Sequence, residues 1–198
     1  MDSVLSNGSR TASTKIVIAG GFGVGKTTLV GSVSEIMPLR TEALVTNESE
    51  GVDDLASTPG KSTTTVAMDF GRITLAEDLV LYLFGTPGQK RFWFMWDDLV
   101  RGAIGAIVLV DTGRLDAAFA PLDYFESKSV PFIVAVNEFE GGPTYPLNEI
   151  AEALALPADV PLITVDARDR ASDYAYALAR FVDVDDPALF EGRRRKSD

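Results

Sequence analysis

Eight residues near the start of the chain have the types and spacing of a phosphate-binding loop. Gly20 to Thr27 read Gly-Gly-Phe-Gly-Val-Gly-Lys-Thr, directly after the apolar run 16–19. In such a loop, glycines let backbone N–H groups close around phosphate oxygens, and the next helix points its N-terminus at the anion. Lys26 would reach the β- and γ-phosphates, and the Thr27 hydroxyl would ligate the Mg²⁺ that bridges them. The expected nucleotide-binding residues here are Gly21, Gly23, Val24, Gly25, Lys26, Thr27 and Thr28.

The composition limits the chemistry that is open to the chain. At 198 residues and 46% hydrophobic content, it is long enough for one substantial core and too short for two ordinary domains. The net charge of -11 argues against a nucleic-acid surface. Cysteine and histidine are both absent, which excludes disulfides, thiolate or imidazole metal sites and a Ser-His-Asp triad. Positioning, metal and charge remain, and phosphoryl chemistry needs little else.

The two ends of the chain differ from its middle. Residues 1–14 are polar and have no apolar core of a signal peptide, so we expect a flexible leader. Residues 185–198 form a charged tail that we expect to be flexible. No run of about eighteen apolar residues is present, so we expect no integral membrane segment. A single domain over 15–184 in a cytoplasmic protein, peripheral to a membrane at most through partners, is the expected organisation.

Short apolar runs alternate with helix-like stretches along most of the chain, which is the pattern of an α/β fold. The runs are rich in Val, Ile and Leu, as in strands buried on both faces of a mostly parallel sheet. The strand-like runs are 15–20, 65–70, 79–84, 103–111, 131–136 and 162–165, and the helix-like stretches are 26–37, 91–101, 115–126, 146–155 and 170–182.

One region breaks the alternation. Residues 66–83 leave no room for a helix between two runs, so they should form a hairpin with one antiparallel edge strand. Thr41 to Thr64 show little periodicity and are expected to be a functional loop or an insertion. The expected fold is the three-layer fold of P-loop NTPases with a six-stranded, mostly parallel sheet.

Two segments after the loop resemble the Ras-like small GTPase superfamily. Thr65 to Phe70 read Thr-Val-Ala-Met-Asp-Phe, similar to the start of the second strand in Rab-type members. Gly85 to Gln89 resemble the Asp-x-x-Gly-Gln element of switch II. Within the superfamily, the chain resembles the bacterial mutual-gliding type and, more closely, the GTP-binding proteins of actinobacterial conservon operons, which share runs such as Phe-Gly-Thr-Pro-Gly-Gln and the aromatic segment 92–99.

The resemblance gives the switch residues their expected roles. Thr65 would bind Mg²⁺ and sense the γ-phosphate, with Thr63 and Thr64 as alternatives if the register shifts. Gly88 would offer its N–H to the γ-phosphate, and Gln89 would orient the attacking water. Arg40 is a further candidate, as an arginine finger supplied in cis.

The chain departs from the family at two points. Gly85 stands where most members carry a metal-side Asp, so a carboxylate that holds a metal-bound water is missing. In place of Asn-Lys-x-Asp, the chain has Asn137, then Glu138, and Glu140 two residues later. Glu140 still offers two oxygens to the guanine edge, which favours guanine over adenine.

A second base-contacting loop follows the last strand. The run Asp166-Ala167-Arg168 resembles the Ser-Ala-Lys loop of the family. Ala167 would donate its N–H to the guanine carbonyl, and Arg168 would pack on the ring. An ordinary surface loop has the same appearance, so the order of elements carries this assignment.

These features predict a GTPase switch that cycles between GTP and GDP forms with Mg²⁺. Hydrolysis should be slow without a partner, because no strong acid or base is evident. The resemblance implies a roadblock-type regulator and a sensor-kinase-like protein from the same operon as partners. The aromatic segment 92–96 is either helix packing or a partner surface. A nucleotide-bound scaffold without useful turnover is the alternative, and a P-loop kinase is disfavoured by the Thr-Pro-Gly-Gln run.

Overall fold

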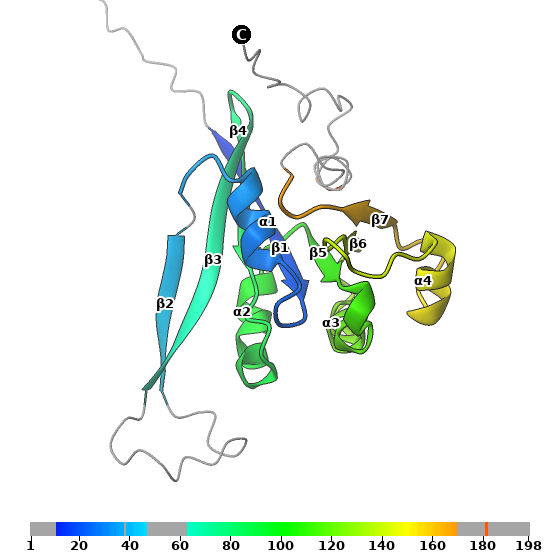
Figure 1. Ribbon diagram of the computed structural model, residues 1–198. Helices are drawn as coiled ribbons and strands as arrows, with labels where there is room; N and C mark the ends of the chain where they lie inside the picture. The colour runs from blue at the N-terminus through cyan, green and yellow to red at the C-terminus, as the bar shows by residue number, and fades with distance from the viewer. Residues whose placement is uncertain (1–10, 38, 47–62, 170–180, 182–198) are drawn as a thin grey trace, which may run out of the picture.

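The computed structural model describes residues 11–37, 39–46, 63–169 and 181. Strands and helices alternate along most of this length, as the apolar runs predict (Figure 1). In chain order the elements are β1 (Ala12–Gly20), α1 (Lys26–Val33), β2 (Leu39–Thr46), β3 (Thr63–Ala76), β4 (Leu79–Gly85), η1 (Lys90–Met95), α2 (Trp96–Val100), β5 (Gly105–Val110), η2 (Thr112–Arg114), α3 (Asp116–Ser127), β6 (Phe132–Asn137), α4 (Leu147–Ala153) and β7 (Leu162–Val165), where η marks a 3-10 helix.

A single sheet runs through the described residues in the order β2-β3-β4-β1-β5-β6-β7. Neighbours from β4 to β7 pair in parallel, whereas β3 is antiparallel to both β2 and β4. The predicted hairpin is therefore present as β3 and β4, joined by a tight turn at Glu77 and Asp78. The predicted α/β fold with a mostly parallel sheet is confirmed.

The sheet contains one strand that the sequence analysis assigned to a loop. β2 pairs with β3 from Leu39 opposite Phe70 to Thr46 opposite Thr63, so β2 is the edge strand and β3 lies inside it. An edge strand pairs on one side only and does not need the continuous apolar run of a central strand. This segment, Leu-Arg-Thr-Glu-Ala-Leu-Val-Thr, mixes polar and apolar residues and therefore lacked that signal.

Two apolar clusters lie on opposite faces of the sheet and make the three layers. Alternate residues of β1 divide between them: Ile16 and Ile18 join the cluster that contains Leu29 and Val30 of α1. Val17 and Ala19 join the cluster built with the other helices. The members of this second cluster from the helical layer are Trp96, Ala118, Leu122, Phe125, Ile150 and Leu154.

Helices α1 and α4 are shorter than the sequence predicted, whereas α3 matches the predicted helix 115–126 within one residue. α1 ends at Val33, because Ser34 turns to extended backbone and its Oγ accepts a hydrogen bond of 3.2 Å from the backbone N–H of Arg72 in β3. The predicted helix 91–101 divides into η1 and α2. The predicted helix 170–182 lies outside the described residues except for Phe181, and so do residues 1–10 of the leader and the whole tail. In the described part of the chain, no helix has both the length and the apolarity that crossing a membrane requires.

Candidate functional site

The loop between β1 and α1 has the backbone geometry of a phosphate cradle. Gly20, Gly23 and Gly25 adopt positive φ angles of 137°, 75° and 104°. These values are easily reached by glycine and strained for other residues, so the sequence allows a turn that directs successive N–H groups inward. Gly25 directly precedes α1, so the N-terminus of that helix faces the same space.

Lys26 lies across this cradle. Its Nζ donates to the carbonyl oxygens of Gly20 at 2.9 Å and Gly21 at 2.6 Å, and its side chain is only 8% exposed. Burial lowers the pKa of Lys26 to about 8, and the nearby Asp69 carboxylate opposes this shift. A phosphate bound here would meet a cation that is already in position.

Gly88 closes the cradle from the loop after β4. A side-chain carbon added to Gly88 would lie 2.8 Å from both Lys26 Nζ and Phe22 Cα. The backbone at Gly88 therefore faces the lysine ammonium with no side chain between them. Gln89 follows and is exposed, and its Oε1 accepts a hydrogen bond of 3.0 Å from Arg91 Nε.

Asp69 of β3 lies in the candidate site, and the sequence analysis did not single it out. Thr27 Oγ1 donates to Asp69 Oδ2 at 2.5 Å. A side-chain carbon on Gly85 would lie only 3.0 Å from Asp69 Cβ and 3.2 Å from its Oδ2. A carboxylate from the neighbouring strand thus lies beside Gly85, which has none of its own. The register of the hairpin brings the two residues together: Phe70 pairs with Phe84, and Asp69 and Gly85 each lie one residue beyond that pair.

The hydroxyl of Thr27 and the carboxylate of Asp69 are hard oxygen donors of the kind that Mg²⁺ prefers, so these two residues fit the implied metal. Thr65 lies within β3, opposite Leu44 of β2. The structure describes the backbone of Thr65 and of Arg40 and not their side chains. The assignments of Thr65 as metal ligand and of Arg40 as arginine finger therefore stay predictions.

Asn137, at the end of β6, connects the cradle to the loop after β7. Its Nδ2 donates to the carbonyl of Val24 at 3.0 Å, and its Oδ1 accepts from the N–H of Ala167 at 2.9 Å. Asn137 is buried and both bonds are internal. The N–H of Ala167, which the sequence predicts to contact a base carbonyl, therefore already donates to Asn137. To bind a base as well, it would have to divide its hydrogen bond between the two acceptors.

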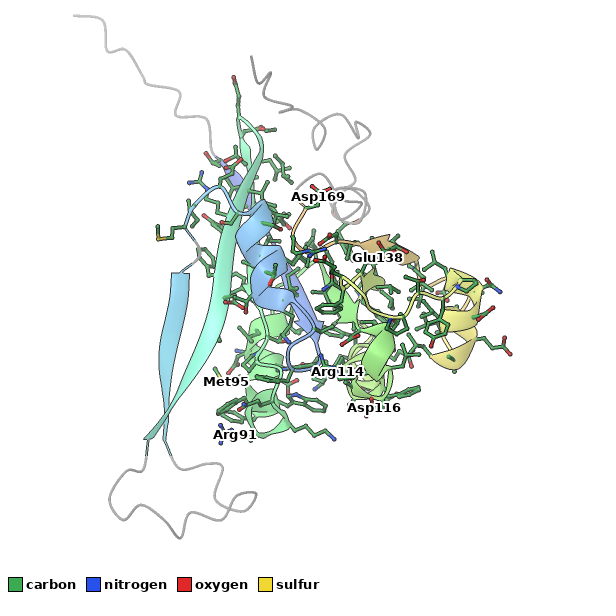
Figure 2. All side chains as sticks on the ribbon, in the orientation of Figure 1. Arg91, Met95, Arg114, Asp116, Glu138 and Asp169 are labelled. Carbon is green, nitrogen blue, oxygen red and sulfur yellow. The ribbon has the colours of Figure 1, made fainter. Side chains whose placement is uncertain are left out.

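Charged side chains gather beside this connection. Arg168 forms a two-pronged contact with Asp166, with Nε and Nη2 at 2.9 and 2.8 Å from its carboxylate oxygens. The hydrogen bonds from Arg168 lower the pKa of Asp166 to about 2. Arg168 Nη1 also lies 3.6 Å from Glu140 Oε2. Glu138 is exposed on the same loop (Figure 2).

The aromatic segment divides between core and surface. Trp96 is fully buried, stacks on Phe125 and donates from Nε1 to the carbonyl of Pro87 at 3.2 Å. Phe92 is buried too, whereas Phe94 is 49% exposed. One tryptophan thus anchors the loop that carries Gly88, and at least one aromatic ring is available at the surface.

A family profile described as a conserved hypothetical ATP binding protein matches residues 18–184. The chain belongs to this family. The matched part begins in β1 and includes the cradle, Asp69, Gly88 and the loop after β7. An uncharacterised protein of Methanocaldococcus jannaschii is 31% identical over 130 residues, which cover 65% of this chain and 71% of the relative.

Two solved G domains have the same fold. The FeoB G domain of Methanococcus jannaschii superposes with a TM-score of 0.57 at 12% identity, over 87% of this chain and 99% of that chain. The G domain of the T. maritima FeoB iron transporter gives 0.55 at 16% identity, over 91% and 99%. At these identities the likeness concerns the fold, and the family member described here has the fold of a P-loop G domain.

Proposed function

We propose that this chain is a GTP-binding and GTP-hydrolysing molecular switch that works with Mg²⁺. The observation that carries the proposal is that Lys26 and Thr27, at the start of α1 after the first loop, and Gly88, in the loop after β4, meet at the mouth of one phosphate cradle. A site that only held phosphate would need the first loop alone. A second loop that meets the lysine at a bare glycine can respond to the presence of a terminal phosphate.

Each residue has a physical task in this proposal. Lys26 places positive charge on the β- and γ-phosphates, and Gly88 offers its N–H to the γ-phosphate. Gln89 would leave its contact with Arg91 to orient the attacking water, and its exposed side chain has room for that movement. Thr27, Thr65 and Asp69 hold the metal, directly or through water. When bound, Mg²⁺ neutralises charge that develops on the phosphate oxygens.

Glu140 and Arg168 are proposed to select the base. Glu140 accepts two hydrogen bonds from the guanine edge, and Arg168, fixed by Asp166, keeps the carboxylate near the site and packs on the ring. An adenine base offers no matching pair of donors to a carboxylate. The description of the family names ATP, so an adenine nucleotide is the competing ligand in any test.

The wider role is proposed from the resemblance to conservon-operon and gliding-type GTPases. The chain would act in bacterial signalling, with a roadblock-type regulator and a sensor-kinase-like protein as partners. The contact between Gln89 and Arg91 holds the water-orienting side chain in another arrangement, which supports slow hydrolysis without a partner. The same contact favours the second candidate, a nucleotide-bound scaffold with little turnover.

The nucleotide carried by the purified protein tests the base. GDP or GTP in the extract supports Glu140 as the selecting residue, and ADP or ATP refutes it. A single-turnover assay then separates switch from scaffold. Release of γ-phosphate from bound GTP that requires Mg²⁺ supports the switch. If no γ-phosphate is released over hours, with and without the roadblock-type protein, the nucleotide-bound scaffold is the candidate that remains.

A further inference from the structure

Arg114, in η2, contacts the phosphate cradle from outside. Its Nη1 donates to the carbonyl oxygen of Phe22 at 3.2 Å, and Figure 2 places it beside the loop that leads into α1. A side-chain carbon on Gly23 would lie 3.5 Å from Arg114 Nη2. The guanidinium thus covers the outer side of the Phe22–Gly23 peptide.

Asp111 fixes the position of this guanidinium. Arg114 Nε and Nη2 both lie 2.9 Å from Asp111 Oδ2. The other carboxylate oxygen of Asp111 accepts from the N–H of Gly113 at 2.9 Å and so caps η2. Because the planar guanidinium is held at two nitrogens, its third nitrogen points in a defined direction, toward the carbonyl of Phe22.

The carbonyl of Phe22 and the N–H of Gly23 belong to one peptide group. In a trans peptide these two bonds point in opposite directions, so a carbonyl held outward directs the N–H inward to the cradle. Gly23 has a φ of 75°, and glycine adopts either sign of φ with little cost, so nothing in the residue itself prevents this peptide from turning over. A cation at the carbonyl also polarises the peptide and strengthens its N–H as a donor.

We propose that Arg114 is a positioning residue for nucleotide binding, which holds the Phe22–Gly23 peptide so that the Gly23 N–H faces the phosphates. This inference rests on the proposed nucleotide function, because it assigns a task within the same site. It does not depend on which base is bound.

The test compares arginines in two similar ion pairs. Arg114 and Arg101 each pair with an aspartate three residues earlier, and both are at least half exposed, but Arg114 is the one whose guanidinium contacts the cradle. In the full-length chain, Arg114→Ala should raise the dissociation rate of fluorescently labelled GDP about tenfold, as expected for a lost charge-assisted hydrogen bond. Arg114→Lys should restore part of the loss, and Arg101→Ala should stay within about twofold of the wild type.

A spectroscopic readout separates positioning from general stability. In the GDP complex, the amide proton of Gly23 should resonate downfield, as for an N–H bonded to phosphate, and Arg114→Ala should move it back while the other cradle amides keep their shifts. If Arg114→Ala does not fold, Arg114→Gln and Asp111→Asn give the same comparison. If Arg114→Ala leaves both the GDP dissociation rate and the Gly23 amide shift unchanged, this inference is overturned and the proposed function is not. A wild-type chain that binds neither GDP nor ADP would overturn the proposed function and this inference together.

Discussion

The phosphate end and the base end of the candidate site are built in different ways. At the phosphate end, side-chain carbons added to Gly25 or Gly88 would lie only 2.6 and 2.8 Å from neighbouring atoms. At the base end, the side chain of Glu140 is 90% exposed and reaches Arg168 only at 3.6 Å. One end is defined by backbone in close packing, and the other by charged side chains in solvent.

This difference teaches where the site can change. Backbone groups in a packed loop are held by the residues that contact that loop, so phosphate binding is tied to the fold. Exposed side chains can be exchanged without disturbing the core, so the proposed base selection can depart from the Ras-like pattern that the chain resembles, as Glu138 and Glu140 do. Substitutions at the two ends should therefore differ in size and in kind.

The largest effect is expected for Gly25→Ala. Its φ of 104° strains any other residue, and the added carbon would meet Asn137 Nδ2 and break the bond from Asn137 to Val24. Strain and a lost buried hydrogen bond together should weaken GDP binding about a hundredfold. Isothermal titration with GDP measures this loss.

Gly102→Ala is the matched control. Gly102 also has a positive φ, of 75°, but nothing lies within 4 Å of an added carbon. It should cost only the backbone strain, about 1 kcal/mol of unfolding free energy in urea, and leave GDP affinity unchanged. Equal losses of affinity in the two variants would contradict the view that crowding defines the phosphate end.

Asp69→Ala should give the next largest effect. Removing a carboxylate that positions a metal-bound group typically weakens metal affinity 10- to 100-fold, so the Mg²⁺ concentration for half-maximal hydrolysis should rise about thirtyfold. Mg²⁺ titrations of GTP hydrolysis and of GDP release measure it. The variant Gly85→Asp alone is the control. It should destabilise the protein, because it places a second carboxylate against that of Asp69.

Moving the carboxylate tests the replacement directly. The double variant Asp69→Gly with Gly85→Asp returns the acid to β4 and removes the crowding atom from β3. It should recover most of the Mg²⁺ affinity that Asp69→Ala loses. A double variant no better than Asp69→Ala would mean that Asp69 serves Thr27 rather than the metal.

Asp69 also marks the limit of what the sequence could predict. The loop 20–27 was readable because glycine spacing and a flanking strand specify its backbone directly, and the hairpin was readable from two apolar runs too close for a helix. Asp69 reaches Thr27 only through the register of β3 against β4, which the apolar pattern leaves open because both faces of those strands carry apolar residues. Arg114 depends on a single turn, η2, that has no periodicity to detect.

A moderate effect is expected at the base end for Glu140→Ala. Losing a charged acceptor that reads the guanine edge should reduce GDP affinity about tenfold and leave ADP affinity unchanged. Competition between labelled GDP and unlabelled GDP, IDP or ADP measures both. Glu138→Ala removes the same charge from the same exposed loop and should change neither affinity beyond about twofold. Equal effects of the two substitutions would mean that the net charge of the loop, and not a contact between Glu140 and guanine, determines which base is bound.

The smallest effect is a change of GDP affinity with pH, which should arise at the phosphate end and not at the base end. In the nucleotide-free protein burial lowers the pKa of Lys26 to about 8, whereas the phosphates of a bound nucleotide favour the charged form and raise it. Well below pH 8 the lysine is charged in both states and affinity is constant; from about pH 7 upward, binding takes up an increasing fraction of a proton and affinity falls as pH rises. At the base end, the low pKa of Asp166 keeps its pair with Arg168 charged throughout this range.

GDP affinity should therefore drop about fourfold between pH 7 and 8.5, with uptake of about 0.8 proton per nucleotide at the higher pH. Titration calorimetry in two buffers of different ionisation enthalpy measures both quantities. Glu140→Ala should shift the whole curve without changing its slope, and a flat wild-type curve to pH 9 would show that the cradle already holds Lys26 charged before the nucleotide arrives.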